Sequence, residues 1–253
     1  MKASLDIVDE YWSKHLGYDI RRIKPGQTFI VGREIPYKRG EAGDRVSLIY
    51  VAASLNRYLV SAQWKLVDKL QEIIDNLPQP EALLQEETES HLRRVCQEIL
   101  NIRRPLKMYS GPKFYCDEES LVLCESSNVK GVTPEMTQEV MRYLSEGGPD
   151  LEYAIQEGTA FVWYEGGIPV SYCGTVRPVT YMLDQVARVG GIFTLEEHRR
   201  RGFAKAVLSA TTRAILDSGR IALYGTFQSN IASINTALSA GYKKYADTFR
   251  VDL

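Results

Sequence analysis

The residues best suited to chemistry lie in one short segment, EEHRRRGFAKAVL, at residues 196–208. Three consecutive arginines precede Gly202, and a helix is predicted to begin within a residue or two of that glycine. Gly202 has no Cβ, so a ligand can approach the main chain closely. The first turn of a helix exposes unpaired N–H groups and carries about half a positive charge, and arginine adds forked donors that suit phosphate. The pattern predicts a binding site for a phosphate-bearing ligand.

A second interpretation of the arginines is a solvated basic surface or a nucleic-acid contact. Glu196 and Glu197 lie just before them, separated by His198, and weaken such a patch, and the formal net charge of the chain is −1. The following helix places Phe203, Val207 and Ala210 on one face, so it can pack on a sheet while its first turn stays accessible. The sequence therefore favours the phosphate site and predicts no nucleic-acid partner.

The strand before the arginines, VARVGGIFT, contains the consecutive residues Gly190 and Gly191. Glycine inside a strand often marks a bulge or a close backbone approach. A bulge would leave backbone groups of Ile192, Phe193 and Thr194 available to an extended ligand, as an added strand would use them. The alternative is a pair of glycines that only make room for a bulky neighbour.

Alternating strands and helices must position these residues. Strands are predicted at residues 28–34, 45–52, 120–125, 159–164, 168–176, 186–194, 220–227 and 242–251. Helices are predicted at residues 5–16, 62–77, 81–99, 134–146, 204–218 and 230–241. With antiparallel hairpins mixed in, this order indicates an α/β or α+β sheet with helices packed on its faces.

Residues 101–115, NIRRPLKMYSGPKFY, mix proline, glycine and serine and are interpreted as a connector. A boundary is placed there, which divides the chain into a smaller N-terminal α/β domain at residues 1–110 and a second domain at residues 111–253. Trp12 and Trp64 lie at helical spacing in the first part and are predicted to be core residues.

The bulk composition excludes several classes of protein. Hydrophobic residues make up 44% of the 253 residues, which suffices for a sizeable core. The four cysteines form no C-x-x-C pair and the chain has three histidines, so no metal site is predicted. The N-terminal sequence is unlike a signal peptide, and the longest apolar run is too short to cross a bilayer. We expect a cytoplasmic protein without a membrane partner.

The segment IFTLEEHRRRGFAKAVL resembles the acyl-CoA-binding motif of the GNAT superfamily of N-acyltransferases, with Arg199, Gly202 and Ala204 at the motif positions. A second block, NIASINTALSAGY, is similar to the superfamily's Asn-x-x-Ser segment and the helix after it. The hairpin at residues 159–176 also fits, and the resemblance covers about residues 119–253. Two blocks in the right order are more specific than either alone.

The resemblance implies a GNAT-like mixed, mainly antiparallel sheet and an acyl-CoA donor, usually acetyl-CoA. It implies that backbone amides of residues 200–204 hold the pyrophosphate, that residues 192–194 pair with the pantetheine arm, and that Asn230 contacts the cofactor. The candidate cofactor-binding residues are Ile192, Phe193, Thr194, Arg199, Arg200, Arg201, Gly202, Phe203, Ala204, Asn230 and Ser233.

Transfer to an amine also needs a group that takes the amine proton, because an alkyl amine is mostly protonated at neutral pH. The candidate catalytic residues are the acids Glu157, Glu165 and Asp184 and the tyrosines Tyr224 and Tyr242. Many GNAT members carry a tyrosine in the helix after the Asn-x-x-Ser block as the acid for the leaving thiolate, and this chain has Ala237 there.

Two functions are therefore kept open. One is N-acyltransfer from acetyl-CoA to a primary amine in a small molecule or a peptide, by direct attack in a ternary complex. The other is a catalytically weak module that binds acyl-CoA as a sensor, an alternative that Ala237 favours. For the N-terminal part three alternatives are kept open: it covers the acceptor cleft, it forms a homodimer contact, or it does neither.

Overall fold

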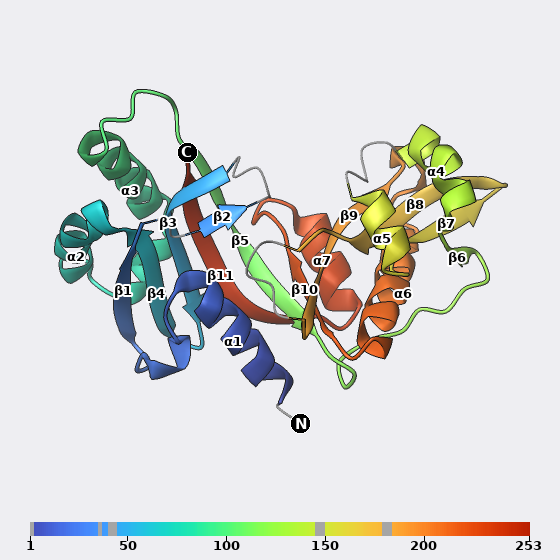
Figure 1. The fold of residues 1–253 in the computed structure, drawn as a ribbon, viewed down its shortest axis with the longest axis horizontal. Helices are drawn as coiled ribbons and strands as arrows, with labels where there is room; N and C mark the ends of the chain where they lie inside the picture. The colour runs from blue at the N-terminus through green and yellow to red at the C-terminus, as the bar shows by residue number, and fades with distance from the viewer. Residues whose placement is uncertain (1–2, 35–36, 40–44, 145–149, 179–183) are drawn as a thin grey trace.

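The computed structural model describes residues 3–34, 37–39, 45–144, 150–178 and 184–253 (Figure 1). These residues form an eleven-stranded sheet in the order β1-β4-β3-β11-β5-β10-β9-β8-β7-β6, with β2 paired to β3. The strands are β1 (Gln27–Arg33), β2 (Tyr37–Arg39), β3 (Arg45–Ser54), β4 (Arg57–Gln63), β5 (Lys107–Cys116), β6 (Val129–Gly131), β7 (Phe161–Glu165), β8 (Ile168–Thr175), β9 (Val186–Thr194), β10 (Ile221–Gly225) and β11 (Lys243–Asp252). Most neighbouring pairs are antiparallel, and β1–β4 and β9–β10 are parallel. The predicted fold class is confirmed.

Helices pack on both faces of this sheet. They are α1 (Ser4–Leu16), α2 (Val67–Asp75), α3 (Glu86–Ile99), α4 (Thr137–Leu144), α5 (Leu151–Gln156), α6 (Phe203–Asp217) and α7 (Ile231–Ser239). On β10, Ala222 and Tyr224 pack in the cluster that includes α6 and α7, whereas Leu223 packs in the cluster that includes α1. Because side chains alternate between the faces of a strand, α1 lies on the face opposite to α6 and α7. None of the helices in the described ranges combines the length and the apolar character that a bilayer crossing requires.

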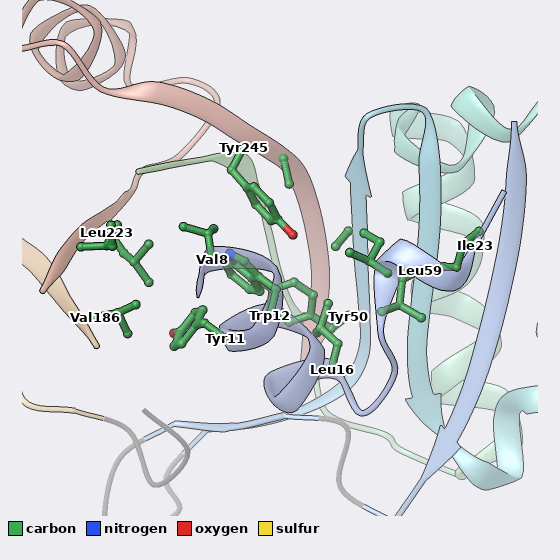
Figure 2. Close-up of a cluster of buried hydrophobic side chains, with 14 residues drawn as sticks. Val8, Tyr11, Trp12, Leu16, Ile23, Tyr50, Leu59, Val186, Leu223 and Tyr245 are labelled. Atoms are coloured by element: carbon green, nitrogen blue, oxygen red, sulfur yellow. The ribbon is translucent and has the colours of Figure 1, made fainter. Parts of the chain in front are cut away.

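Strand β11 joins the two parts of the chain. It pairs with β3 along one edge and with the whole length of β5 along the other. Helix α1 reinforces this junction from one face. Figure 2 shows Tyr11 and Trp12 of α1 between Leu223 of β10 and Tyr50 of β3. Residue 110, the predicted domain boundary, lies inside β5; the division into two domains stays a prediction.

The prediction of a connector at residues 101–115 was wrong, because β5 is a central strand. The Pro112 carbonyl accepts from Thr226 N–H at 3.4 Å, on the side where β10 has just ended, so the missing N–H of Pro112 costs no ladder hydrogen bond. A Cβ at Gly111 would lie 2.0 Å from the Thr226 carbonyl oxygen, so only glycine fits this approach. Both residues are explained by contacts with distant segments, which their local sequence does not reveal.

Two further predictions were wrong. Residues 120–125 are not a strand: Val122 N–H donates to the Ala240 carbonyl, and Cys124 N–H donates to Ser209 Oγ, so this segment runs along α7 and α6. Trp64 is 59% exposed, because it begins a short 3-10 turn before α2 and does not lie on the buried face of that helix. Trp12, by contrast, is buried as predicted.

Candidate functional site

Strands β9 and β10 diverge next to the predicted bulge. They pair only from Val186 to Arg188 on β9. Immediately afterwards, the register between β8 and β9 shifts, and Gly191 adopts a φ of +64°. A Cβ at Gly190 would lie 2.4 Å from a Val176 methyl carbon. The bulge is confirmed, and it needs glycine both for the positive φ and for the close approach.

Beyond the bulge, β9 presents backbone groups to the opening between the strands. Leu195 N–H donates to a carbonyl of β8 at 2.9 Å, and Phe193 lies opposite a β8 residue in the register. Because N–H direction alternates along an antiparallel strand, Phe193 and Leu195 face β8, and Ile192 and Thr194 face the side from which β10 has departed. The Thr194 carbonyl on that side accepts from Arg199 Nε at 3.1 Å. Of the three residues predicted to offer backbone groups to a ligand, Ile192 and Thr194 therefore direct their N–H groups to the open side.

Helix α6 begins where the arginines predicted a helix N-terminus. Gly202 is the N-cap with a φ of +86°, and Arg200 also has a positive φ, of +62°. No side chain of the described residues caps the helix, so its first N–H groups stay available for an anion. No described atom lies within 4 Å of a Cβ built on Gly202, so the space above the glycine is open. This geometry fits a bound phosphate.

The arginines differ in what they contact. Arg201 makes a bidentate ion pair with Glu165, and its guanidinium lies 4.7 Å from the Phe203 ring centre. His198 Nδ1 lies 2.6 Å from the same carboxylate. The hydrogen bonds from Arg201, followed by those from His198, hold the pKa of Glu165 below its usual value. Arg200 is exposed at the loop. Glu165 therefore belongs to the arginine loop, where it orders Arg201, and we do not assign it a role as a base.

The second sequence block lies at the other side of the opening. The Asn230 side chain caps α7 by accepting from Ser233 N–H at 3.1 Å. Ser233 Oγ lies 2.5 Å from the Tyr224 hydroxyl, and burial raises the pKa of Tyr224 to about 12. Asn230 and Tyr224 line a common cavity with the bulge residue Ile192. The two blocks that carry the resemblance thus meet at the end of the paired region of β9 and β10.

The cavity between these elements has a volume of about 460 Å³, within the range of small-molecule sites. It extends from the bulge of β9 across β10, β5 and β11 to the side chains of α1. Side chains from both faces of the sheet line it, since Leu223 packs with α1 and Tyr224 packs with α6 and α7. Its titratable lining side chains are Tyr11, His15, Tyr50, Tyr109, Lys113, Asp150, Tyr172, Arg188, Tyr224 and Arg250. The N-terminal part of the chain thus supplies one wall of the cavity.

Of the five predicted catalytic residues, Tyr224 lines this cavity and the others lie elsewhere. Glu157 pairs with Arg220, with 2.7 Å between carboxylate and guanidinium. Asp184 is exposed in the turn before β9. Tyr242 is buried in the core, where its hydroxyl lies 2.7 Å from Thr212 Oγ1. Glu165 lies at the arginine loop, as described above.

Sequence reasoning missed most of the polar residues in the cavity. These are His15, Lys113, Asp150, Arg188 and Arg250. Arg188 carried a usable signal, since it precedes Gly190 by two residues on a predicted strand and therefore faces the same side. Lys113 and Arg250 come together through the pairing of β5 and β11, His15 comes from α1, and Asp150 lies at the start of α5. The described residues contain no group of three or more His, Cys, Asp or Glu side chains that could hold a metal ion.

Ala237 has no exposed surface and packs in the core cluster with Val207, Leu208 and Tyr242. It does not line the cavity. Tyr224 contacts α7 through Ser233 and also lines the cavity. Among the residues described, it is the one tyrosine that does both.

Comparison with known proteins agrees with this geometry. Residues 178–251 match a family model described as FR47-like protein. An acetyltransferase of the GNAT family from Colwellia psychrerythraea aligns over 100% of this chain and 98% of its own, with a TM-score of 0.51 and 12% identity. A search of curated proteins finds no match.

Two other solved structures align over part of their length. A GCN5-related N-acetyltransferase from Kribbella flavida has a TM-score of 0.47 and 17% identity, over 61% of this chain and 62% of its own. A GNAT-family protein from Novosphingobium aromaticivorans has a TM-score of 0.47 and 16% identity, over 58% of this chain and 65% of its own. This chain thus spans less than two thirds of these two proteins.

The fold is that of the GNAT acetyltransferases, as the alignment over the full length of the Colwellia protein shows. The predicted resemblance to the GNAT superfamily is confirmed by this fold together with the matched family model over β9, α6, β10, α7 and most of β11.

Proposed function

We propose that the protein transfers an acetyl group from acetyl-CoA to a primary amine. One observation carries this proposal: the opening between β9 and β10 lies beside a helix N-terminus whose N–H groups no described side chain caps. The opening offers strand backbone for an extended chain such as pantetheine, and the helix offers N–H groups for a diphosphate. Both features are needed for acyl-CoA, and neither is needed for a basic surface patch.

On the donor side, the proposed contacts come mainly from the main chain. The N–H groups from Arg200 to Ala204 bind the diphosphate, with Arg200 adding charge from its exposed position. Ile192 and Thr194 pair with the pantetheine arm through the backbone groups that face the opening. Asn230, at the start of α7, lines the same cavity, and Ser233 contacts Tyr224, which also lines it.

In the reaction, the amine nitrogen attacks the thioester carbonyl, an N–C bond forms, and the C–S bond breaks. The carbonyl oxygen gains negative charge in the transition state, and an N–H group on the exposed side of β9, that of Ile192, is suited to stabilise it. The amine nitrogen loses one proton, and the departing thiolate gains one or leaves as the anion, since a thiol has a pKa of about 8.5.

Two cavity residues are proposed to manage these protons. Tyr224 keeps its proton at neutral pH because burial raises its pKa to about 12, so it can donate to the thiolate. Asp150 is an acid among the residues that line the cavity, and it can accept the amine proton directly or through water. Holding both substrates in one cavity supplies a further large part of the rate.

A sensor that binds acyl-CoA without transfer is the second candidate, and the buried Ala237 favours it because the residue offers no acid. Two measurements on the full chain separate the candidates. Calorimetric titration with CoA tests donor binding, and release of free thiol from acetyl-CoA across a panel of amines tests transfer. Binding with amine-dependent thiol release supports the enzyme, binding without release on any amine supports the sensor, and no binding contradicts both.

A matched pair of variants tests whether the arginine loop holds the donor. Arg200→Gln removes an exposed charge beside the helix N-terminus, whereas Arg213→Gln removes the charge of a half-buried side chain on α6 that pairs with Glu118. We expect the first to weaken CoA binding by about threefold to tenfold and the second to leave it unchanged. Equal effects of the two variants would contradict the assignment.

A further inference from the structure

Tyr172 of β8 has a buried side chain whose hydroxyl forms no hydrogen bond with the described residues. The residue is 3% exposed and lines the cavity, yet among the residues that the structure describes none donates to its hydroxyl or accepts from it. Tyr245, by contrast, is 6% exposed and donates to Asp9 Oδ1 at 2.7 Å. Polar groups that are removed from water are nearly always paired. The unpaired hydroxyl of Tyr172 therefore needs an explanation, and a ligand in the cavity can supply one.

This hydroxyl lies beside two glycines at the place where the pairing of β8 and β9 shifts. A Cβ built on Gly174 would lie 2.3 Å from Tyr172 Oη, so the tyrosine side chain lies along its own strand and occupies the space that Gly174 leaves open. Gly174 pairs with Gly190 of β9, and the register shift lies between Tyr172 and Gly174. The phenol is thus next to the bulge, at whose Ile192 N–H the thioester carbonyl is proposed to lie.

Tyr172 and Tyr224 reach the cavity from opposite faces of the sheet. Cys173, the residue after Tyr172, packs in the cluster of α6 and α7 that also contains Tyr224. Tyr172 packs with Leu151 and Ala154 of α5. Because side chains alternate between the faces of a strand, the two phenols lie on opposite faces. Strand β9 and the opening beside it lie between β8 and β10, so a donor held in the opening has one phenol on either face.

The face of Tyr172 is the one that remains for the acceptor. Tyr224, on the other face, is proposed to protonate the leaving thiolate. Asp150, which is proposed to accept the amine proton, is the N-cap residue of α5, the helix that packs with Tyr172. Burial raises the pKa of Tyr172 above its usual value, and Cys173 and Asp150 raise it further. The phenol therefore keeps its proton at neutral pH, and its oxygen can accept a hydrogen bond.

Resting on the proposed acetyl transfer, we propose that the hydroxyl oxygen of Tyr172 accepts a hydrogen bond from the acceptor amine and directs the amine nitrogen to the thioester at the bulge. A neutral primary amine attacks with two N–H groups. As the N–C bond forms and the C–S bond breaks, one proton passes to Asp150, and the other stays on the nitrogen and on its hydrogen bond to Tyr172. The phenol keeps its own proton. A neutral secondary amine has one N–H and loses it, so this arrangement selects primary amines.

Tyr172→Phe removes the hydroxyl and keeps the ring. The full chain is assayed with acetyl-CoA and with whichever of ethylamine, ethanolamine, phenethylamine and alanine gives the fastest release of thiol. We expect kcat/KM for the amine to fall by about tenfold, the worth of one hydrogen bond. The KM for acetyl-CoA and the calorimetric Kd for CoA should stay unchanged. The unfolding temperature should stay the same or rise, because the lost hydroxyl has no partner among the described residues.

Tyr245→Phe is the matched control. Tyr245 is also buried, but its hydroxyl is hydrogen-bonded to Asp9 and the residue does not line the cavity. We expect this variant to unfold about 2–4 °C lower, because Asp9 loses its donor, and to keep the wild-type kcat/KM for the amine. If Tyr172 had only a structural role, Tyr172→Phe would behave in the same way.

A second readout compares the same primary amine with its N-methyl derivative. The steric cost of the methyl group is shared by all variants, whereas the hydrogen bond to Tyr172 is lost in one of them. The wild type and Tyr245→Phe should prefer the primary amine in kcat/KM by at least about tenfold, and Tyr172→Phe should reduce this preference by about threefold or more.

The outcomes separate the two proposals. No release of thiol with any primary amine overturns the proposed function and this inference with it. With transfer established, an unchanged kcat/KM for the amine in Tyr172→Phe, or an unchanged preference for the primary amine, overturns the inference alone. So does a Tyr172→Phe variant that binds CoA more weakly and unfolds at a lower temperature, since a structural residue behaves in that way.

Discussion

A substitution at Gly202 tests the diphosphate site with a matched control. Gly202 has a φ of +86° and open space above it, so a side chain added there meets strain but no clash. Asn and Asp enter the left-handed region more readily than other side chains, and both cap helices well. Gly202→Asn and Gly202→Asp therefore have nearly the same shape and strain, and they differ by one negative charge.

The charge sets the size of the expected effect. Two unit charges about 5 Å apart repel by about 1.7 kcal/mol at an effective dielectric constant near 40. This corresponds to about twentyfold in Kd. We expect the Asp variant to bind CoA about twentyfold more weakly than the Asn variant at low salt, and by less at high salt because the charges are screened.

Calorimetric titration with CoA and thermal unfolding measure the two effects separately. The two variants should unfold at temperatures within about 2 °C of each other, because their backbone strain is alike. Equal CoA affinity of the Asn and Asp variants would refute the placement of the diphosphate at this helix N-terminus.

Four further substitutions test individual residues. Glu165→Gln should keep kcat within about threefold, because this carboxylate holds Arg201 outside the cavity, and a hundredfold loss would restore it as a base. Tyr224→Phe should lower kcat by about tenfold at unchanged CoA affinity, and an unchanged kcat would contradict the role of Tyr224 as the acid. Because the pKa of Tyr224 is about 12, the pH profile of wild-type kcat should show no decrease from this phenol up to about pH 10. Ala237→Tyr should lower the free energy of unfolding by about 1–3 kcal/mol, measured by denaturant titration, because it overfills a closed core; an unchanged stability would mean that the site has room. The pKa of His15 in the folded protein is about 3, below its value in the unfolded chain, so the unfolded chain binds the extra proton and the free energy of unfolding falls as the pH drops from about 6.5 to 3. His15→Gln should reduce the slope of this fall by up to about 1.4 kcal/mol per pH unit. An unchanged slope would contradict the lowered pKa.

The bulge of β9 and the starts of α6 and α7 could be predicted because their signals are local. Gly190 and Gly191 predicted the bulge of β9, and Gly202 after the arginines predicted the start of α6. Each signal follows from what glycine permits within a few residues of chain. The same holds for Asn230, whose side chain caps α7 in the way its type and position indicate.

The part of the cavity that α1, β5 and β11 form could not be predicted because it depends on pairing over long range. Lys113 and Arg250 line one cavity only because β11 pairs with β5. The strand β5 was not predicted, because Gly111 and Pro112 indicated a connector. Likewise, His15 lines the cavity because α1 packs against residues of β3 and β10, which are separated by β11 and β5. Of the predicted acids, Glu157 pairs with Arg220 and Glu165 with Arg201, and Asp184 is exposed before β9.

The most direct test of the central claim is a crystal structure of the protein with CoA bound. We expect diphosphate oxygens at hydrogen-bond distance, about 3 Å, from the backbone nitrogens between Arg200 and Ala204, and the pantetheine arm along Ile192 to Thr194. Electron density that places the diphosphate elsewhere, with those nitrogens bound to water alone, would contradict the account.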